Sequence, residues 1–74
     1  MLTKAKAERL LQRGDVVYYV EDGTVHEVTF RKALNEYLIT DQGDLYYDEV
    51  GLTWFLHKRT AENCARGLPG RWSQ

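Results

Sequence analysis

Residues 16–30 read VVYYVEDGTVHEVTF, a run of β-branched and aromatic residues divided near its middle by Asp22-Gly23. Valine, tyrosine, threonine and phenylalanine are enriched in strands, and Asp-Gly is among the strongest short signals for a tight turn between antiparallel strands. The stretch therefore predicts a β-hairpin with strands at about residues 15–21 and 24–31.

Three more short strands are expected after this hairpin. A third strand covers EYLITD (36–41), and Gln42-Gly43 turns the chain into a fourth strand, DLYYD (44–48). The segment before the third strand, 32–35, is a loop or a strand extension. A short acidic connection then leads into a fifth strand, LTWFL (52–56).

A helix is expected on each side of the strands. Residues 3–13 are mostly good helix formers, with Thr3 as the N-cap and Gly14 as the residue that ends the helix. The narrow apolar stripe that would dock this helix on a sheet is formed by Ala7, Leu10 and Leu11. A shorter second helix covers residues 58–66, and residues 68–74 are expected to form a flexible tail.

These elements predict one domain, residues 1–67, of a mainly β (α+β) class. We expect a small SH3-like barrel of about five antiparallel strands with an N-terminal helix and a short C-terminal helix. An open five-stranded sheet with both helices on one face is the alternative. A chain of 74 residues buries only about 60% of its unfolded surface, so one small core is expected.

Charge is unevenly distributed along the chain, although the net charge is only −1. Residues 14–56 carry nine carboxylates and two basic side chains, whereas residues 1–13 and 57–74 each carry four basic side chains and one carboxylate. An acidic body repels a phosphate backbone and favours a basic partner. The plain alternative is a solvated surface balanced by its two ends.

The chain offers little for metal or covalent chemistry. His26, His57 and Cys64 lack the spacing of a zinc site, and we expect no metal, no cofactor and no catalytic residue. Cys64 follows His57 by seven residues, on one face of the second helix, but a packed structural thiol is favoured over a nucleophile. A single cysteine, no signal peptide and no apolar run of about 20 residues indicate a cytoplasmic protein without a membrane span.

Aromatic residues come in adjacent pairs. Neighbours in a strand point to opposite faces, so one ring of each pair should face outward. The pairs are Tyr18 with Tyr19, Tyr46 with Tyr47, and Trp54 with Phe55. If Leu45 and Tyr47 point inward, Tyr46 points outward; if Trp54 points inward, Phe55 points outward, or the reverse.

Outward rings among carboxylates make a candidate surface for a protein partner. The residues expected to contact that partner are Asp44, Tyr46, Tyr47, Asp48 and Glu49. Three other interpretations stay open: cross-strand pairs that only stabilise the sheet, an aromatic cage for a methylated lysine, and a stacking platform for single-stranded nucleic acid.

Longer motifs add a resemblance to a known group of proteins. GDVVYYVEDGTVHEVTF (14–30), YLITDQGDLYYDEVG (37–51), TWFL (53–56) and a helix containing AEN (61–63) resemble a scheme found in small proteins of bacteriophages, prophages and gut bacteria. That scheme runs G-D-x-V-Y-Y-V, a hairpin, a D-x-G-D turn, E-V-G-x-T-V-F-L and a closing T-R-E-E-A-E helix. The similarity extends from residue 14 to about residue 63. It implies a small barrel-like β fold and a mobile-element origin, and it implies no reaction.

The sequence departs from this scheme where the closing helix begins. His57-Lys58-Arg59 stands where the scheme has Thr-Arg-Glu, so basic residues replace an acidic first turn that would complement the helix dipole. This either weakens the start of the helix or keeps these charges for a partner.

The hypothesis is a non-enzymatic protein of a bacterial host cell that binds a host or phage protein through the acidic, aromatic surface. It would occupy a basic, nucleic-acid-handling surface and so inhibit a host defence complex, as anti-CRISPR proteins do. The alternatives are a homo-oligomeric structural protein, in which dimerisation adds burial, and a nucleic-acid-binding regulator that uses the basic ends. That regulator would use Lys58, Arg59, Arg66, Arg71 and Trp72.

Overall fold

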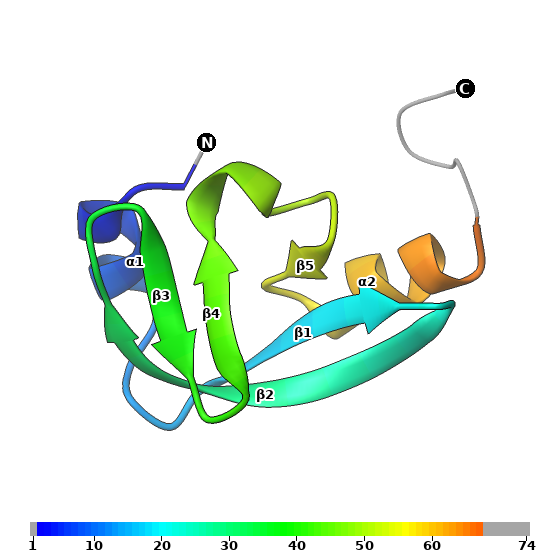
Figure 1. The fold of residues 1–74 in the computed structure, drawn as a ribbon, viewed down its shortest axis with the longest axis horizontal. Coiled ribbons are helices and arrows are strands. Elements are labelled where there is room, and N and C mark those ends of the chain that lie inside the picture. Colours follow the sequence, from blue (N-terminus) through cyan, green and yellow to red (C-terminus); the bar gives the residue numbers. More distant parts are fainter. Residues whose placement is uncertain (1, 68–74) are drawn as a thin grey trace.

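The predicted hairpin is confirmed in the computed structural model, which describes residues 2–67. Strands β1 (Val16–Glu21) and β2 (Thr24–Ala33) pair antiparallel (Figure 1). Asp22 and Gly23 join them with φ angles of 53° and 75°. Two successive positive φ values define a type I′ turn, whose twist matches that of the strands and whose second position suits glycine. The expected tail, 68–74, lies outside the described residues.

Strand β2 belongs to both halves of the sheet. Its first part pairs with β1 as far as Thr29, and its second part pairs with β3 (Tyr37–Thr40) from Phe30 to Ala33. The register shifts between Phe30 and Lys32, which makes Arg31 the extra residue of a β-bulge. Bulges bend a strand and increase its twist, and the sheet curls at this point.

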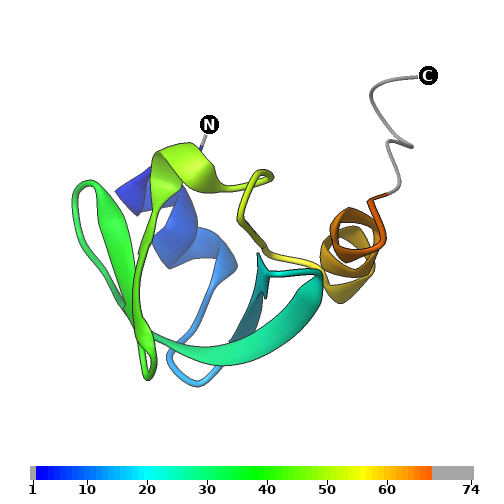
Figure 2. The same cartoon turned by 45° about the vertical axis from the view of Figure 1, so that its right-hand side comes forward.

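Five antiparallel strands in the order β4-β3-β2-β1-β5 make a curled half-barrel (Figure 2), which confirms the mainly β, barrel-like fold. Strand β4 covers Gly43–Tyr46 and β5 only Trp54–Phe55. The turn before β4 is Asp41-Gln42, one residue earlier than expected. The expected fourth and fifth strands are both too long, because Tyr47–Glu49 winds into a 3-10 turn, η1, and residues 50–53 continue turning before β5.

Helix α1 (Lys4–Leu10) is shorter than expected. Thr3 is its N-cap, and its Oγ1 accepts a hydrogen bond from the backbone N–H of Lys6 at 3.3 Å. The helix ends at Leu10 because Leu11 is already extended, which turns Leu11 into the core and leaves Leu10 exposed. Gly14 therefore does not end the helix. Its N–H donates to the carbonyl of Phe30 at 2.9 Å, so it starts the sheet instead.

The two helices cover different faces of the sheet, which contradicts the alternative of an open sheet with both helices on one face. Ala7 and Leu11 of the α1 region belong to the core inside the half-barrel, whereas α2 (Lys58–Ala65) packs against β1, β2 and β5 from outside (Figure 2). Trp54 and Phe55 are both buried, so the expectation that one of them faces solvent is wrong. Trp54 lies in the main core, and α2 covers the opposite face of β5 beside Phe55.

Trp54 also holds the two edges of the half-barrel together. It is fully buried, and its indole Nε1 donates a hydrogen bond of 2.7 Å to the carbonyl of Tyr46 at the end of β4. Within residues 2–67, β4 and β5 are the two outer strands and do not pair with each other. One side-chain hydrogen bond thus takes the place of a backbone ladder across the opening.

Replacing Trp54 tests this arrangement. Trp54→Phe keeps an aromatic ring but removes the indole N–H and leaves unfilled volume, so the free energy of unfolding should fall by about 2–3 kcal/mol. Urea unfolding followed by circular dichroism measures the change. Leu52→Ala is the control, because Leu52 is 68% exposed in the same connection and its loss should cost less than about 0.5 kcal/mol. Equal effects of the two substitutions would contradict the role given to Trp54.

Candidate functional site

The five predicted partner-binding residues lie around β4 and η1, but they do not share one site. Tyr46, Tyr47 and Asp48 line a hollow of about 280 Å³, which we call the tyrosine hollow. Asp44 and Glu49 line a second hollow of about 240 Å³, which we call the seam cleft. Sequence adjacency assigned these residues to one surface, whereas the structure divides them between two hollows.

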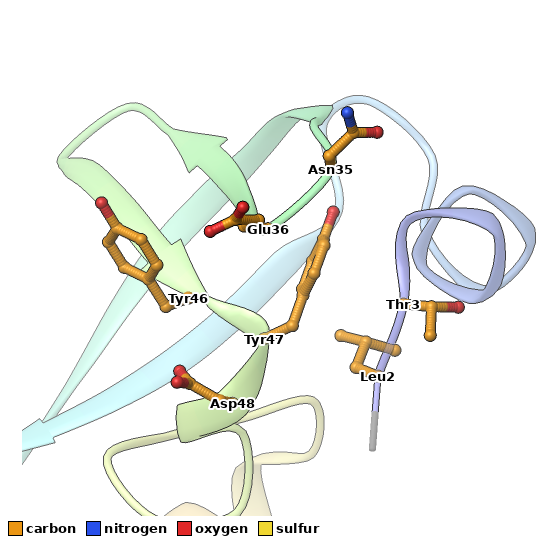
Figure 3. A pocket seen from close by; sticks show the side chains of 7 residues that line it. All are labelled: Leu2, Thr3, Asn35, Glu36, Tyr46, Tyr47 and Asp48. Atoms are coloured by element: carbon orange, nitrogen blue, oxygen red, sulfur yellow. The ribbon is translucent and has the colours of Figure 1, made fainter.

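The tyrosine hollow is built from three separate segments of the chain (Figure 3). Its lining consists of Leu2, Thr3, Asn35, Glu36, Tyr46, Tyr47 and Asp48. The N-terminal residues come from the segment before α1, and the Asn35-Glu36 pair comes from the loop before β3. These four residues were missed, because their place beside η1 is set by the packing of distant segments.

Tyr47 forms the floor of the hollow rather than a contact on its rim. Its ring is only 4% exposed, and its hydroxyl donates a hydrogen bond of 2.7 Å to the carbonyl of Leu34. Burial, together with the negative charge of Glu8, raises the pKa of the Tyr47 hydroxyl above its ordinary value of 10.0, against the opposing effect of the Leu34 bond. Strand alternation left open which ring of the Tyr46–Tyr47 pair faces inward, and the structure shows that it is Tyr47, whose side chain has a structural role.

Tyr46 is the exposed aromatic of the site, as the alternation of the strand predicts. Its ring is 46% exposed and lies directly across the sheet from Tyr37, with ring centroids 5.1 Å apart and planes tilted by 39°. Such cross-strand aromatic pairs stabilise a hairpin. Tyr46 thus has a structural role on one side and still offers ring surface to the hollow on the other.

The carboxylates of Glu36 and Asp48 line the hollow together with Tyr46 (Figure 3). Glu36 sits there because its carbonyl accepts a hydrogen bond of 3.1 Å from the N–H of Tyr47, which continues the β3–β4 register. Counting outward along both strands from the turn at Asp41-Gln42 pairs Glu36 with Tyr47, so the sequence contained a signal for the position of Glu36. Among residues 2–67 one ion pair forms, Lys58 with Glu27 at 3.9 Å, so both carboxylates are available to a partner.

The basic residues of the nucleic-acid alternative lie on α2. Three of them are exposed on or just after this helix, on the outer face of the sheet: Lys58, Arg59 and Arg66. Lys58 forms an ion pair with Glu27. Arg71 and Trp72 lie outside the described residues. The described part of this basic group is therefore separate from the predicted acidic residues around β4.

The remaining reactive side chains have ordinary surroundings. Cys64 is half-buried, and its Sγ lies 3.8 Å from the carbonyl oxygen of Leu52, while His57 is the exposed residue that precedes α2. Over the described part of the chain, no group of three or more His, Cys, Asp or Glu side chains is placed to hold a metal ion. Neither described helix is long and apolar enough to span a bilayer.

Comparison of the chain with family models, with curated proteins and with solved structures found no match.

The raised pKa of Tyr47 predicts a pH effect on stability. The folded protein holds the phenolic proton more tightly than the unfolded chain, so this contribution is complete below about pH 10 and is lost as pH rises through the raised folded pKa. Tyr47→Phe should flatten the fall in unfolding free energy above pH 10, while costing about 1 kcal/mol at pH 7 through the lost bond to Leu34. Urea unfolding at several pH values measures both effects.

Tyr46→Phe is the control for this titration, because it removes a tyrosine hydroxyl from an exposed ring and leaves Tyr47 in place. That variant should keep the loss of stability that Tyr47 causes above pH 10. An unchanged alkaline slope in Tyr47→Phe would show that the buried hydroxyl does not couple to folding.

Proposed function

We propose that this protein is a non-enzymatic binding module that takes a basic segment of a partner protein into the tyrosine hollow. One observation supports this above all others: the exposed ring of Tyr46 and the carboxylates of Glu36 and Asp48 line one hollow together with buried apolar side chains. Lysine and arginine combine an apolar stem with a charged tip, and such a hollow complements both parts.

The contact would divide between the floor and the rim. The stem of a basic side chain packs along the Tyr46 ring, which is 46% exposed, above the buried floor that Leu2 and Tyr47 form. Its charged group meets Glu36 or Asp48, and the exposed part of the Tyr46 ring adds a cation–π contact. An arginine gains more than a lysine here, because its planar group stacks on rings and pairs with carboxylates through two hydrogen bonds.

The charge of the whole body supports a basic partner over a nucleic acid. Residues 14–56, which form the strands, the seam cleft and most of the lining of the tyrosine hollow, carry nine carboxylates and two basic side chains. A surface with this excess attracts a basic protein at long range and raises its rate of association, while it repels phosphate.

The resemblance to proteins of phages, prophages and gut bacteria extends the proposal to a kind of partner. A mobile-element protein of this charge would bind a basic surface that handles nucleic acid in a host complex, and would inhibit that complex by occupying the surface. The acidic body supports this version because it presents to such a surface the same sign of charge as the nucleic acid it displaces.

A charge-neutral variant of the hollow tests the proposal. Glu36→Gln with Asp48→Asn removes two exposed charges and keeps the shapes of the side chains, so the affinity for the partner should fall about tenfold, the effect of two partly exposed ion pairs. The partner is first captured from host lysate on the immobilised protein and identified by mass spectrometry. Its dissociation constant is then measured with purified components by calorimetry.

The matched control is Glu21→Gln with Asp22→Asn, which makes the same charge change at the far tip of the β1–β2 hairpin (Figure 1). This variant should bind as the wild type does. Equal losses in both variants would mean that only net charge matters, and no loss in either would remove the hollow from the interaction. A gel shift with single-stranded and duplex DNA at low salt tests the nucleic-acid alternative, for which binding must weaken steeply as salt is added.

A further inference from the structure

The half-barrel stays open along one line, between β4 and the chain that leads into β5. The hydrogen bonds between β3 and β4 show which backbone groups of β4 face this opening. In an antiparallel pair of strands, the residues that lie opposite each other alternate along the strands. One pair exchanges backbone hydrogen bonds, and in the next pair the backbone N–H and C=O groups point away from the partner strand. The N–H of Tyr47 donates a hydrogen bond to the carbonyl of Glu36, the residue before β3. Tyr46 and Asp44 are one and three residues before Tyr47 and lie opposite Tyr37 and Ile39. Their backbone groups therefore point away from β3.

The bond from Trp54 supports this alternation. The carbonyl of Tyr46 accepts the indole N–H of Trp54 at 2.7 Å, so it faces the opening. By the same alternation the N–H and the carbonyl of Asp44, two residues earlier, face the opening as well. The β4 edge thus presents backbone donors and acceptors at Asp44, the arrangement that an added extended strand requires.

The seam cleft lies beside this edge, on the concave side of the sheet. Its lining consists of Tyr19, Val28, Thr40, Gln42, Gly43, Asp44, Leu45, Glu49 and Thr53. Val28 and Leu45 belong to the core or pack against it, which gives the cleft an apolar bottom. Asp44 and Glu49 are exposed residues of this lining, and none of the nine lining residues is a cation.

Two contacts hold the walls of the cleft in place. The ring of Tyr19 stacks on that of His26, with centroids 4.7 Å apart and planes within 16° of parallel. The two residues are direct partners in the β1–β2 pair. Across the cleft, the Thr53 hydroxyl donates a hydrogen bond of 3.2 Å to Oε1 of Glu49. The aromatic wall and one carboxylate are therefore set before any ligand arrives, which lowers the entropic cost of binding.

We propose that the seam cleft is a second binding site, separate from the tyrosine hollow, that takes one arginine or lysine of an extended peptide segment of a partner protein. The peptide backbone pairs with the β4 edge at Asp44. The basic side chain passes Tyr19 into the cleft, where its charge meets the carboxylate of Glu49. The carboxylate of Asp44, on the face of β4 opposite Leu45, adds attraction at longer range. The strand edge favours a peptide over a free polyamine, because only a peptide has backbone groups to pair with it.

A titration followed by two-dimensional ¹H–¹⁵N NMR tests this site. The probe is an acetylated Gly-Gly-Arg-Gly-Gly amide, added to the full chain at low salt. The expected result is a set of shifted amide signals that includes Tyr19, Asp44 and Glu49, none of which lines the tyrosine hollow. The peptide with citrulline in place of arginine keeps the shape without the charge, and it should bind about tenfold more weakly.

Variants distinguish the cleft from the tyrosine hollow. Asp44→Asn with Glu49→Gln should weaken about tenfold the binding that shifts the amide signals around the cleft. Glu36→Gln with Asp48→Asn should weaken only the binding seen at the tyrosine hollow, and the control Glu21→Gln with Asp22→Asn should change neither. Melting curves check that all three variants fold. The proposal for the tyrosine hollow can therefore be contradicted while that for the seam cleft is supported, and the opposite result is also possible.

Three outcomes would overturn the proposal. The first is binding of spermidine as tight as that of the peptide, which would assign the cleft to a free polyamine. The second is binding of the arginine and citrulline peptides with equal affinity, which would leave the carboxylates without a role. The third is a set of shifted signals confined to the tyrosine hollow, which would leave the cleft without a ligand.

Discussion

Burial of Trp54 organises the whole half-barrel. The indole is fully buried and takes part in the core that both sheet halves share, and its N–H reaches the carbonyl of Tyr46 across the opening between the outer strands. A large ring supplies much of the burial available to a chain this short, and its one polar group would be costly to bury without a partner. Because the partner is a backbone carbonyl at the end of β4, the same bond also fixes where η1 begins and where the residues of both hollows stand.

The bend in β2 produces the concave surface that the outer strands leave open. Arg31 is the added residue at which the strand passes from its pairing with β1 to its pairing with β3. A flat strand would have produced an open sheet, whereas the bulge turns the second half toward the first. The strand edge of β4 then faces the cleft instead of solvent on a flat rim, and the exposed carboxylate of Asp44 discourages uncontrolled pairing along that edge.

The sequence predicted part of the candidate site, and each residue that it placed wrongly or missed has its own physical explanation. Strand alternation correctly required one ring of the Tyr46–Tyr47 pair to face outward, because the direction of neighbouring side chains in a strand is a local property. The structure shows that this ring is Tyr46. Alternation failed for Phe55, because α2 covers the face that it leaves outward. Glu36 and Tyr19 were missed as lining residues, since each comes from an element distant in sequence from η1.

The sequence by itself determined the local features: the β1–β2 hairpin with its Asp22-Gly23 turn, the order of five strands between two helices, and the acidic charge of their surface. These depend on interactions among residues a few positions apart, so propensity and spacing report them directly. Only the tertiary structure decided that the helices cover opposite faces, that Trp54 bridges the open edges, and that one acidic stretch serves two hollows. Those features arise where segments far apart in the chain pack together, and no local pattern specifies which distant surface a side chain will meet.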